Sequence, residues 1–233
     1  MIIALILSGG TGSRLASDIP KQYIEVGGRP VISYSIECLY RHKEIDAVQI
    51  VAEPAWREQI EKWITAEGFD RKFRGFSAPG ENRQLSIFHG LEDIRLYAED
   101  MDYVLIHDAA RPLLRESQIT DCIEGAAGHD GVLPVLPMKD TVYLSSDGKT
   151  VKSLLNRSEI YAGQAPEMFR LGAYYEANRQ LCPKQILKIN GSTEPAVIAG
   201  LDVAMIPGDE RNFKITTMED LQRFREIEEE KYR

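Results

Sequence analysis

The segment LSGGTGSR (residues 7–14) places three glycines and an arginine directly after an apolar run. Glycine has no Cβ, so the backbone N–H groups of such a turn can approach a phosphate closely. Arg14, together with Lys21 on the stiff loop that follows Pro20, could neutralise a triphosphate. The pattern lacks the last glycine of a dinucleotide fingerprint and the Gly-Lys-Ser/Thr of a Walker A loop. Residues 7–14 therefore form either a phosphate cradle or a plain glycine-rich turn between a strand and a helix.

A second group with potential chemistry is IHDAARP (residues 106–112). Asp108 ends a strand of buried type, so its carboxylate should lie beyond the carboxyl ends of the strands, at the same edge as the glycine turn. A carboxylate beside a phosphate is explained when a divalent cation bridges the two. Arg111 follows Asp108 closely and could bind a second anion. The competing hypothesis is an Asp–Arg pair that caps the next helix.

These side chains need a sheet to bring them together, and the chain alternates apolar strands with amphipathic helices. Continuous apolar runs such as IIALILS (residues 2–8) are typical of strands buried on both faces of a parallel sheet. The alternation predicts an α/β fold, a single Rossmann-like, doubly wound and mostly parallel sheet with right-handed crossovers. The expected strands are 2–8, 47–52, 73–78 and 103–107, and the expected helices are 31–41, 55–69 and 82–98.

The second half of the chain departs from this alternation. The segment DTVYLSSDGKTVKSLL (140–155) has an Asp-Gly turn between two alternating runs, which predicts a protruding β-hairpin. A lone hairpin is marginally stable in water, so we expect this arm, at about residues 138–158, to pack against a second subunit. Thr217 and Asp220 form a loose capping box that starts a terminal helix. The sequence shows no linker or repeat, so residues 1–233 are expected to form a single domain.

Composition limits the partners. The chain has 233 residues, 43% of them hydrophobic, and a formal net charge of −8. This acidic balance argues against a nucleic-acid partner, whose backbone calls for a basic face, but not against a small anionic substrate. The N-terminal apolar run lacks a basic flank and is too short to span a bilayer. The unpaired Cys38, Cys122 and Cys182 fit a reducing compartment, so we expect a cytoplasmic protein with no membrane partner.

Several motifs in order along the chain resemble one known family. The chain is similar to the cytidylyltransferases that make CDP-linked polyols, the methylerythritol phosphate and ribitol phosphate cytidylyltransferases. The motifs that carry the resemblance are LSGGTGSR (7–14), PKQY (20–23), GENRQLSI (80–87), IHDAARP (106–112), KDTV (139–142), NRSEIYAGQAPE (156–167) and NFKITTMEDL (212–221). The resemblance implies that residues 1–233 form a single nucleotidyltransferase domain of a cytoplasmic homodimer that acts in isoprenoid biosynthesis.

The resemblance also implies roles for individual residues. It implies that Arg14, Lys21 and Lys214 are catalytic cations. The nucleotide-binding residues that it implies are Ser8, Gly9, Gly10, Thr11, Gly12, Gly80, Arg83, Ser86 and Ala109. The substrate-binding residues that it implies are Asp108, Arg111, Thr141, Arg157 and Thr193, and Asp108 would also help to hold Mg²⁺ as cofactor. Thr141 and Arg157, on the arm, would reach into the site of the neighbouring subunit.

The implied reaction is transfer of CMP from CTP to a polyol phosphate, with release of pyrophosphate. The substrate phosphate is itself the nucleophile, so catalysis should consist of positioning and electrostatic stabilisation. We favour 2-C-methyl-D-erythritol 4-phosphate as the acceptor and keep D-ribitol 5-phosphate as the alternative. Ala165 and the pair Glu194-Pro195 depart from common family residues near the acceptor. Two further alternatives are a nucleotidyltransferase for other substrates and a non-catalytic regulator that binds a nucleotide.

Overall fold

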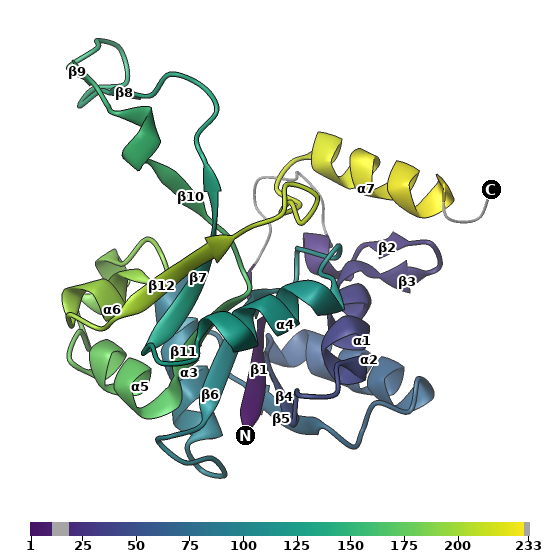
Figure 1. Cartoon of the computed structure of the whole chain (residues 1–233). Coiled ribbons are helices and arrows are strands. Elements are labelled where there is room, and N and C mark those ends of the chain that lie inside the picture. The colour runs from purple at the N-terminus through teal and green to yellow at the C-terminus, as the bar shows by residue number, and fades with distance from the viewer. Residues whose placement is uncertain (11–18, 231–233) are drawn as a thin grey trace.

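The computed structural model describes residues 1–10 and 19–230. Within these residues, eight strands form one central sheet in the order β10–β7–β11–β6–β1–β4–β5, with β12 paired to β7 (Figure 1). The strands β10 and β11 are antiparallel to their neighbours, and the others run parallel. The strands of this sheet are β1 (Ile2–Leu7), β4 (Ala47–Val51), β5 (Phe73–Ser77), β6 (Tyr103–Asp108), β7 (Gly131–Pro137), β10 (Tyr161–Gly163), β11 (Glu167–Arg170) and β12 (Val203–Pro207).

Helices cover both faces of the sheet, as expected of a doubly wound fold. The helices are α1 (Val31–Arg41), α2 (Pro54–Ala66), α3 (Arg83–Ile94), α4 (Glu116–Gly125), α5 (Leu171–Arg179), α6 (Glu194–Ile198) and α7 (Met218–Glu230). Helices α1, α2 and α4 share one apolar core with the sheet, and α3, α5 and α6 share the core on the opposite face. None of the helices in the described residues combines the length and apolar character needed to cross a membrane.

The central strand β1 ends at the edge of the sheet where a ligand would bind, which we call the ligand edge. Its residues Ile3 to Ile6 are completely buried, which explains why both faces of this strand are apolar. Leu7 pairs with Asp108 on β6 and with Val51 on β4. The carboxyl ends of three neighbouring strands therefore end at one level, and Ser8 and Asp108 emerge at the same edge.

The strand β11 runs against this direction. Glu167 at its start pairs with Ile106 near the end of β6, so β11 begins at the edge where this antiparallel neighbour ends. The residues that precede β11, including Ala165, therefore also approach the ligand edge. The antiparallel strands account for the departure from simple alternation that the second half of the sequence shows.

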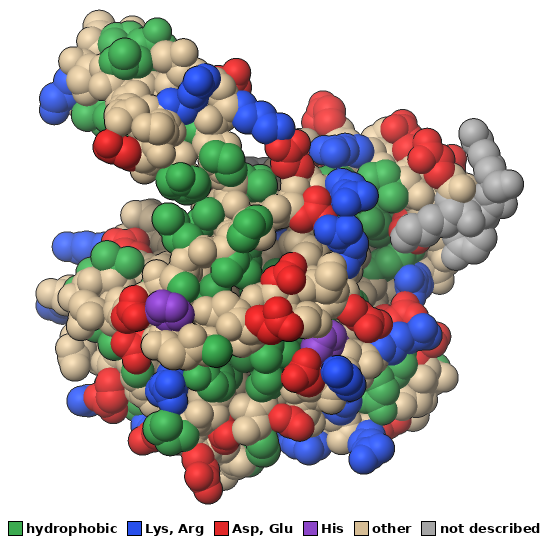
Figure 2. Space-filling view, in the orientation of Figure 1, with side chains coloured by type: hydrophobic (Ala, Val, Ile, Leu, Met, Phe, Trp, Pro, Cys, Tyr) green, Lys and Arg blue, Asp and Glu red, His purple; other side chains and the backbone are tan. Residues whose placement is uncertain are grey.

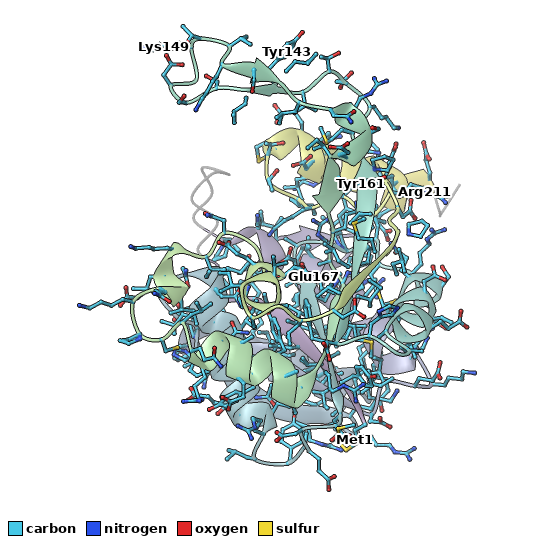
Figure 3. The ribbon with its side chains drawn as sticks, turned by 60° about the vertical axis from the view of Figure 1, so that its left-hand side comes forward. Met1, Tyr143, Lys149, Tyr161, Glu167 and Arg211 are labelled. Atoms are coloured by element: carbon cyan, nitrogen blue, oxygen red, sulfur yellow. The ribbon has the colours of Figure 1, made fainter. Side chains whose placement is uncertain are left out.

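The predicted hairpin is present as an arm that leaves the sheet after β7 and returns at β10, over residues 138–160 (Figure 1). It contains the two-stranded ribbon β8 (Tyr143–Leu144) and β9 (Ser153–Leu154). Asp147 closes the turn at its tip by accepting hydrogen bonds from the backbone N–H groups of Lys149 and Thr150, both at 2.9 Å. Figure 3 shows Tyr143 and Lys149 far from the body of the molecule, whereas Tyr161 lies at the root of the arm.

The last helix, α7, lies over the small ribbon formed by β2 (Glu25–Val26) and β3 (Arg29–Pro30). Its start is the predicted capping box, because Thr217 Oγ1 accepts from the Asp220 N–H at 3.2 Å and Asp220 Oδ2 accepts from the Thr217 N–H at 2.8 Å. Between β12 and α7, residues 208–217 form an irregular connection that carries Lys214 to the ligand edge.

Candidate active site

A pocket of about 430 Å³, lined mostly by polar and charged residues, lies at the carboxyl edge of the parallel strands. The predicted residues that line it are Gly9, Gly10, Lys21, Gly80, Arg83, Ser86, Asp108 and Lys214. These residues come from five separate segments of the chain, so the fold brings together what the motifs had only suggested. Ser8 and Ala109 are buried directly next to lining residues. Thr11, Gly12 and Arg14 lie outside the described residues.

The beginning of the glycine turn is held by the segment that follows Pro20. The side-chain amide of Gln22 donates to the carbonyl oxygens of Ser8 and Gly10, both at 2.8 Å. The Tyr23 hydroxyl donates to the Ser8 carbonyl at 3.0 Å and accepts from the Ser8 hydroxyl at 2.8 Å. Lys21 occupies the same 3₁₀ turn and lines the pocket. The PKQY segment therefore positions both a cation and the backbone of the turn.

The two described glycines of the turn serve different purposes. A Cβ on Gly9 would lie 2.6 Å from Cβ of Pro79, so only glycine allows this close packing. A Cβ on Gly10 would meet nothing within 4 Å, because Gly10 borders the open pocket. The first glycine is explained by packing, and the second leaves room for a group that approaches the backbone.

Asp108 is the centre of a cluster of charges. Its Oδ1 accepts from Arg83 Nε at 3.0 Å, and its Oδ2 lies 3.0 Å from Lys214 Nζ and 3.5 Å from Arg111 Nε. Burial alone would raise the pKa of Asp108, but the charges of Arg83, Lys214 and Arg111 outweigh it and hold that pKa well below its usual value. The cluster keeps an excess of positive charge beside the pocket, which suits an incoming anion.

Arg83 faces the pocket from the first turn of α3. Burial lowers the pKa of its guanidinium, and the nearby carboxylates of Asp108 and Glu167 more than offset this, so the pKa is raised. Its side chain keeps 32% of its surface exposed, and it lines the pocket. Arg83 can therefore hold Asp108 through Nε and still present charge to a ligand.

His107 supports this cluster from behind and is completely buried. Its Nε2 lies 3.2 Å from Ser35 Oγ and 3.2 Å from the Arg111 carbonyl oxygen. Burial lowers the pKa of His107 to about 4, so the imidazole is neutral at physiological pH. A neutral, enclosed histidine of this kind holds the Asp108–Arg111 turn and is not placed to exchange protons with a ligand.

The GENRQLSI segment forms a tight turn at the start of α3. The Gly80 N–H donates to Ser86 Oγ at 2.9 Å, and Asn82 caps the helix by accepting from the Leu85 N–H at 2.8 Å. A Cβ on Gly80 would lie 2.6 Å from the Leu85 side chain, so this turn requires glycine. Ser86 therefore shapes the pocket wall, and its predicted contact with a nucleotide remains a prediction.

Thr193 lies on the β11 side of the site. Its hydroxyl donates to Glu167 Oε2 at 3.2 Å, and Glu167 itself is 7% exposed. Figure 3 shows Glu167 in the body of the molecule, far from the tip of the arm. Burial raises the pKa of Glu167. Thr193 thus borders a buried polar group, but it does not line the pocket as the structure describes it.

The two predicted arm residues lie apart from the pocket of their own chain. Arg157 Nη1 donates to the Lys139 carbonyl at 2.6 Å, and both Thr141 and Arg157 are exposed. Neither side chain lines the pocket. A single chain therefore brings most of the described site residues together at the pocket. Thr141, Arg157 and Thr193 do not line it, and Arg111 adjoins it through its ion pair with Asp108.

The described residues do not by themselves form a complete set of ligands for a metal ion. No group of three His, Cys, Asp or Glu side chains that could hold a metal occurs among residues 1–10 and 19–230. Both oxygens of Asp108 are already engaged by cations. Mg²⁺ commonly keeps several waters and binds one or two carboxylates together with substrate phosphates. The pocket therefore suits a cation that arrives on a triphosphate, and the carboxylate residues on its lining are Asp108, Glu53 and Glu81.

Sequence reasoning missed Gln22 and Asn82. Gln22 is part of PKQY, where only the lysine was given a role, and no local signal shows that its amide reaches back to Ser8 and Gly10. Asn82 had a usable signal, because asparagine before an apolar helical run is a preferred N-cap. Both residues line the pocket and shape its walls.

A doubly wound sheet with a glycine turn, a pocket lysine and a cation-ringed aspartate at its carboxyl edge defines a nucleotide-binding α/β enzyme. The model of the 2-C-methyl-D-erythritol 4-phosphate cytidylyltransferase family matches residues 2–229. The chain belongs to this family, which is a family of nucleotidyltransferases.

Individual relatives agree with this assignment. The 2-C-methyl-D-erythritol 4-phosphate cytidylyltransferase of Syntrophotalea carbinolica is 35% identical over 222 residues, which cover 94% of this chain and 93% of the relative. The bifunctional enzyme IspD/IspF of Granulibacter bethesdensis is 36% identical over 225 residues, which cover 95% of this chain and 55% of the relative. The chain thus spans about half the length of the bifunctional relatives and nearly all of the monofunctional one.

A solved structure extends the likeness to the whole fold. The 4-diphosphocytidyl-2C-methyl-D-erythritol synthase of Anaerococcus prevotii superposes with a TM-score of 0.83 at 26% identity and covers 98% of this chain and 96% of its own. The predicted resemblance and the predicted fold class are therefore confirmed.

Proposed function

We propose that residues 1–233 act as a single nucleotidyltransferase domain that transfers CMP from CTP to 2-C-methyl-D-erythritol 4-phosphate and releases pyrophosphate. The observation that carries this proposal is the pairing of two cationic positions in one pocket. Lys21 lies at the glycine turn, and the cluster around Asp108 contains Arg83, Arg111 and Lys214. One position suits a triphosphate, and the other suits the phosphate of the acceptor.

In this mechanism the protein supplies no nucleophile. A phosphate oxygen of the acceptor attacks the α-phosphorus of CTP, the bond from that phosphorus to the bridging oxygen breaks, and pyrophosphate leaves with the electron pair. The barrier comes from bringing two anions together and from the charge that develops in the transition state. Lys21 and Arg14 stabilise the triphosphate side, while Lys214 and Arg111 orient the acceptor phosphate against it.

Mg²⁺ is the proposed cofactor. When bound to the triphosphate it neutralises charge and stabilises the leaving pyrophosphate. Within the protein, Asp108 has two duties: it holds Arg83, Arg111 and Lys214 in place, and it offers a carboxylate near the metal–triphosphate complex. Ser8, Gly9, Gly10, Thr11 and Gly12 contribute backbone to the cradle, and Gly80, Arg83, Ser86 and Ala109 border the nucleoside.

The active unit is proposed to be a cytoplasmic homodimer with shared sites. Thr141 and Arg157 lie on an arm that projects beyond its own body, and they would complete the acceptor end of the partner's site. The arm exposes apolar side chains, with 57% of Tyr143 and 65% of Leu154 accessible, which supports burial against a second copy. Figure 2 shows such apolar side chains on the arm above the body of the molecule. Thr193 would border the acceptor on the β11 side.

The proposal is tested by measuring pyrophosphate release from CTP and Mg²⁺ with 2-C-methyl-D-erythritol 4-phosphate and with D-ribitol 5-phosphate in parallel. We expect the higher kcat/KM with the methylerythritol substrate and no release without an acceptor. A higher kcat/KM with D-ribitol 5-phosphate would show that the acceptor is ribitol phosphate, while the proposed transfer of CMP from CTP would stand. Nucleotide binding without turnover on either acceptor would favour the non-catalytic alternative.

A further inference from the structure

Residues 208–215 form most of the connection between β12 and α7 (Figure 1), and Lys214 within them lines the pocket. We call this segment the strap. Figure 3 shows Arg211, on the strap, near the root of the arm where Tyr161 lies. Lys214, near the other end, lies 3.0 Å from Asp108 Oδ2. The strap therefore joins two parts of the molecule that the proposed reaction uses.

The first end of the strap is bound to the root of the arm through Gln164, the residue that follows β10. Gln164 is 7% exposed. Its Oε1 accepts from the Asp209 N–H at 2.9 Å, and its Nε2 donates to the Asp209 carbonyl at 3.1 Å. The side-chain amide thus pairs with the strap as a neighbouring strand would, with one donor and one acceptor.

Two further contacts fix the same end. The Gly208 N–H donates to the Val135 carbonyl at 2.8 Å, and Glu210 forms an ion pair with Lys139, near the start of the arm. A Cβ on Gly208 would lie 2.5 Å from Gln164 Oε1, so the close pairing with Gln164 requires glycine here. Burial of Gln164 and its close packing against Gly208 therefore stabilise the two hydrogen bonds between Gln164 and Asp209.

The middle of the strap is bound through Asn212, which is completely buried. Its Nδ2 donates to the Ala165 carbonyl at 2.8 Å, just before β11. Its own carbonyl accepts from Arg111 Nη1 at 2.7 Å. One residue therefore connects the β10–β11 junction to a cation of the Asp108 cluster.

The second end of the strap is bound to the pocket. The Ile215 N–H donates to the Ala110 carbonyl at 2.8 Å, two residues after Asp108. Lys214 precedes this bond directly, so its backbone is held against the turn that carries Asp108. The strap is thus attached at both ends and in the middle to elements that are far apart in sequence.

We propose that Gln164 and Asn212 are positioning residues that hold Lys214 and Arg111 at the acceptor end of the site by fixing the strap to the root of the arm. The kinetic consequence rests on the proposed cytidylyltransferase function, whereas the mechanical link does not. A displacement of about 1 Å can cost up to about 100-fold in a reaction that depends on positioning. We therefore expect movement at the root of the arm to shift the position of Lys214. This shift needs no replacement of any side chain that contacts the substrates.

The first test compares Gln164→Met with Gln49→Met. Methionine has a similar length but neither donor nor acceptor, and Gln49 is also buried, at 3% exposure, with its amide bonded to Ser77 Oγ at 3.0 Å on a different part of the sheet. We expect Gln164→Met to lower kcat/KM for the polyol phosphate by about 10- to 100-fold while KM for CTP changes by less than about threefold. Gln49→Met should not produce this selective loss.

A second pair of variants disturbs the attachment of the strap without replacing Gln164. Gly208→Ala leaves Gln164 in the chain but pushes its amide away, and Asn212→Ala removes the bond to Ala165. Both should give the same selective loss for the acceptor. A uniform loss for both substrates, or the same kinetics in Gln49→Met, would contradict a positioning role.

The mechanical link is tested without turnover, by hydrogen–deuterium exchange on the intact proteins. We expect the Ile215 amide to exchange at least about tenfold faster in Gln164→Met than in the wild type, since its bond to Ala110 is no longer held. Gln49→Met should leave that rate unchanged. If the wild type turns over neither polyol phosphate, the proposed function fails while the exchange data still decide the link. Unchanged exchange at Ile215, or faster exchange with unaltered kinetics, would overturn the proposal.

Discussion

The ligand edge of the sheet and the arm differ in how their predicted functional residues are held. At the ligand edge, Asp108 is fixed by three cations from three segments, and its neighbour His107 is completely buried. On the arm, Arg157 is exposed and bonds to the backbone of Lys139 within the arm itself. The ligand edge is organised within a single chain, whereas Thr141 and Arg157 on the arm lie outside the pocket that the described residues form.

This difference shows where preorganisation comes from in this protein. Cations held around a buried carboxylate need no reorganisation when an anion arrives, which is the electrostatic basis of catalysis by positioning. Exposed arm residues gain such order only when another surface covers them. The comparison therefore predicts large, local effects at the ligand edge and smaller effects that depend on assembly at the arm.

The largest effect is expected from Lys21→Ala. Loss of one cation at the triphosphate should reduce turnover by about 100- to 1,000-fold, or roughly 2.7–4 kcal/mol of transition-state stabilisation. Steady-state kinetics with CTP measures this loss, and circular dichroism should show an intact fold. Near-normal turnover in this variant would contradict the difference drawn between the ligand edge and the arm, because activity would then not depend on the cations fixed at the ligand edge.

A pH effect on stability is expected next, from His107. Its pKa falls from 6.5 to about 4 on folding, so the unfolded chain binds a proton in this range while the folded chain does not. The contribution of His107 to the free energy of unfolding should therefore be nearly complete above pH 6.5 and fall by up to about 3 kcal/mol as the pH drops to 4.

Urea unfolding at several pH values measures this slope in the wild type and in His107→Gln. The variant should show a shallower decline, while the contribution of His42, whose pKa burial also lowers, stays common to both proteins. Equal slopes would show that His107 is not the group that titrates, and that the ligand edge is less enclosed than its contacts indicate.

An intermediate effect is expected from Arg157→Ala, about 10- to 100-fold on kcat/KM, since a hydrogen bond to a charged group contributes about 1.5–3 kcal/mol. Mixing this variant with Asp108→Ala tests whether the arm serves the partner's site. Random mixed dimers carry one intact site, so about a quarter of the wild-type activity should return. No recovery in exchanging subunits would place Arg157 in the site of its own chain.

The smallest effect is expected from Leu154→Ser on the arm. Leu154 is 65% exposed, so the free energy of unfolding of one chain should change by less than about 0.5 kcal/mol. Dimer dissociation, measured by analytical ultracentrifugation, should become about tenfold easier, or about 1.4 kcal/mol. An unchanged dissociation constant would mean that the arm does not contribute apolar surface to the assembly.

Local patterns predicted much of this structure, because they report on backbone preference and burial. The buried run Ile2–Leu7, the Asp-Gly turn of the arm and the Thr217–Asp220 capping box each carry their signal within a few residues. Asp108 was expected at the ligand edge because parallel strands end at a common level, and Lys21 because the stiff loop after Pro20 holds it there. Both residues line the pocket.

The parts that sequence could not predict depend on contacts between distant residues. The pairing of Gln164 with Asp209 joins residues 45 apart, and the bond from Arg111 to Asn212 joins residues 101 apart. Nothing in the local composition of either partner specifies the other. The reversed direction of β11 was likewise invisible, because a short apolar strand has the same pattern in either direction.

That reversal has an evolutionary consequence. Because β11 begins at the ligand edge, the residues before it, such as Ala165, reach that edge on a segment separate from those that carry Ser8, Lys21 and Asp108. Over evolution, substitutions in this short stretch could therefore accumulate without any change in the sequence of the glycine turn or of the IHDAARP motif.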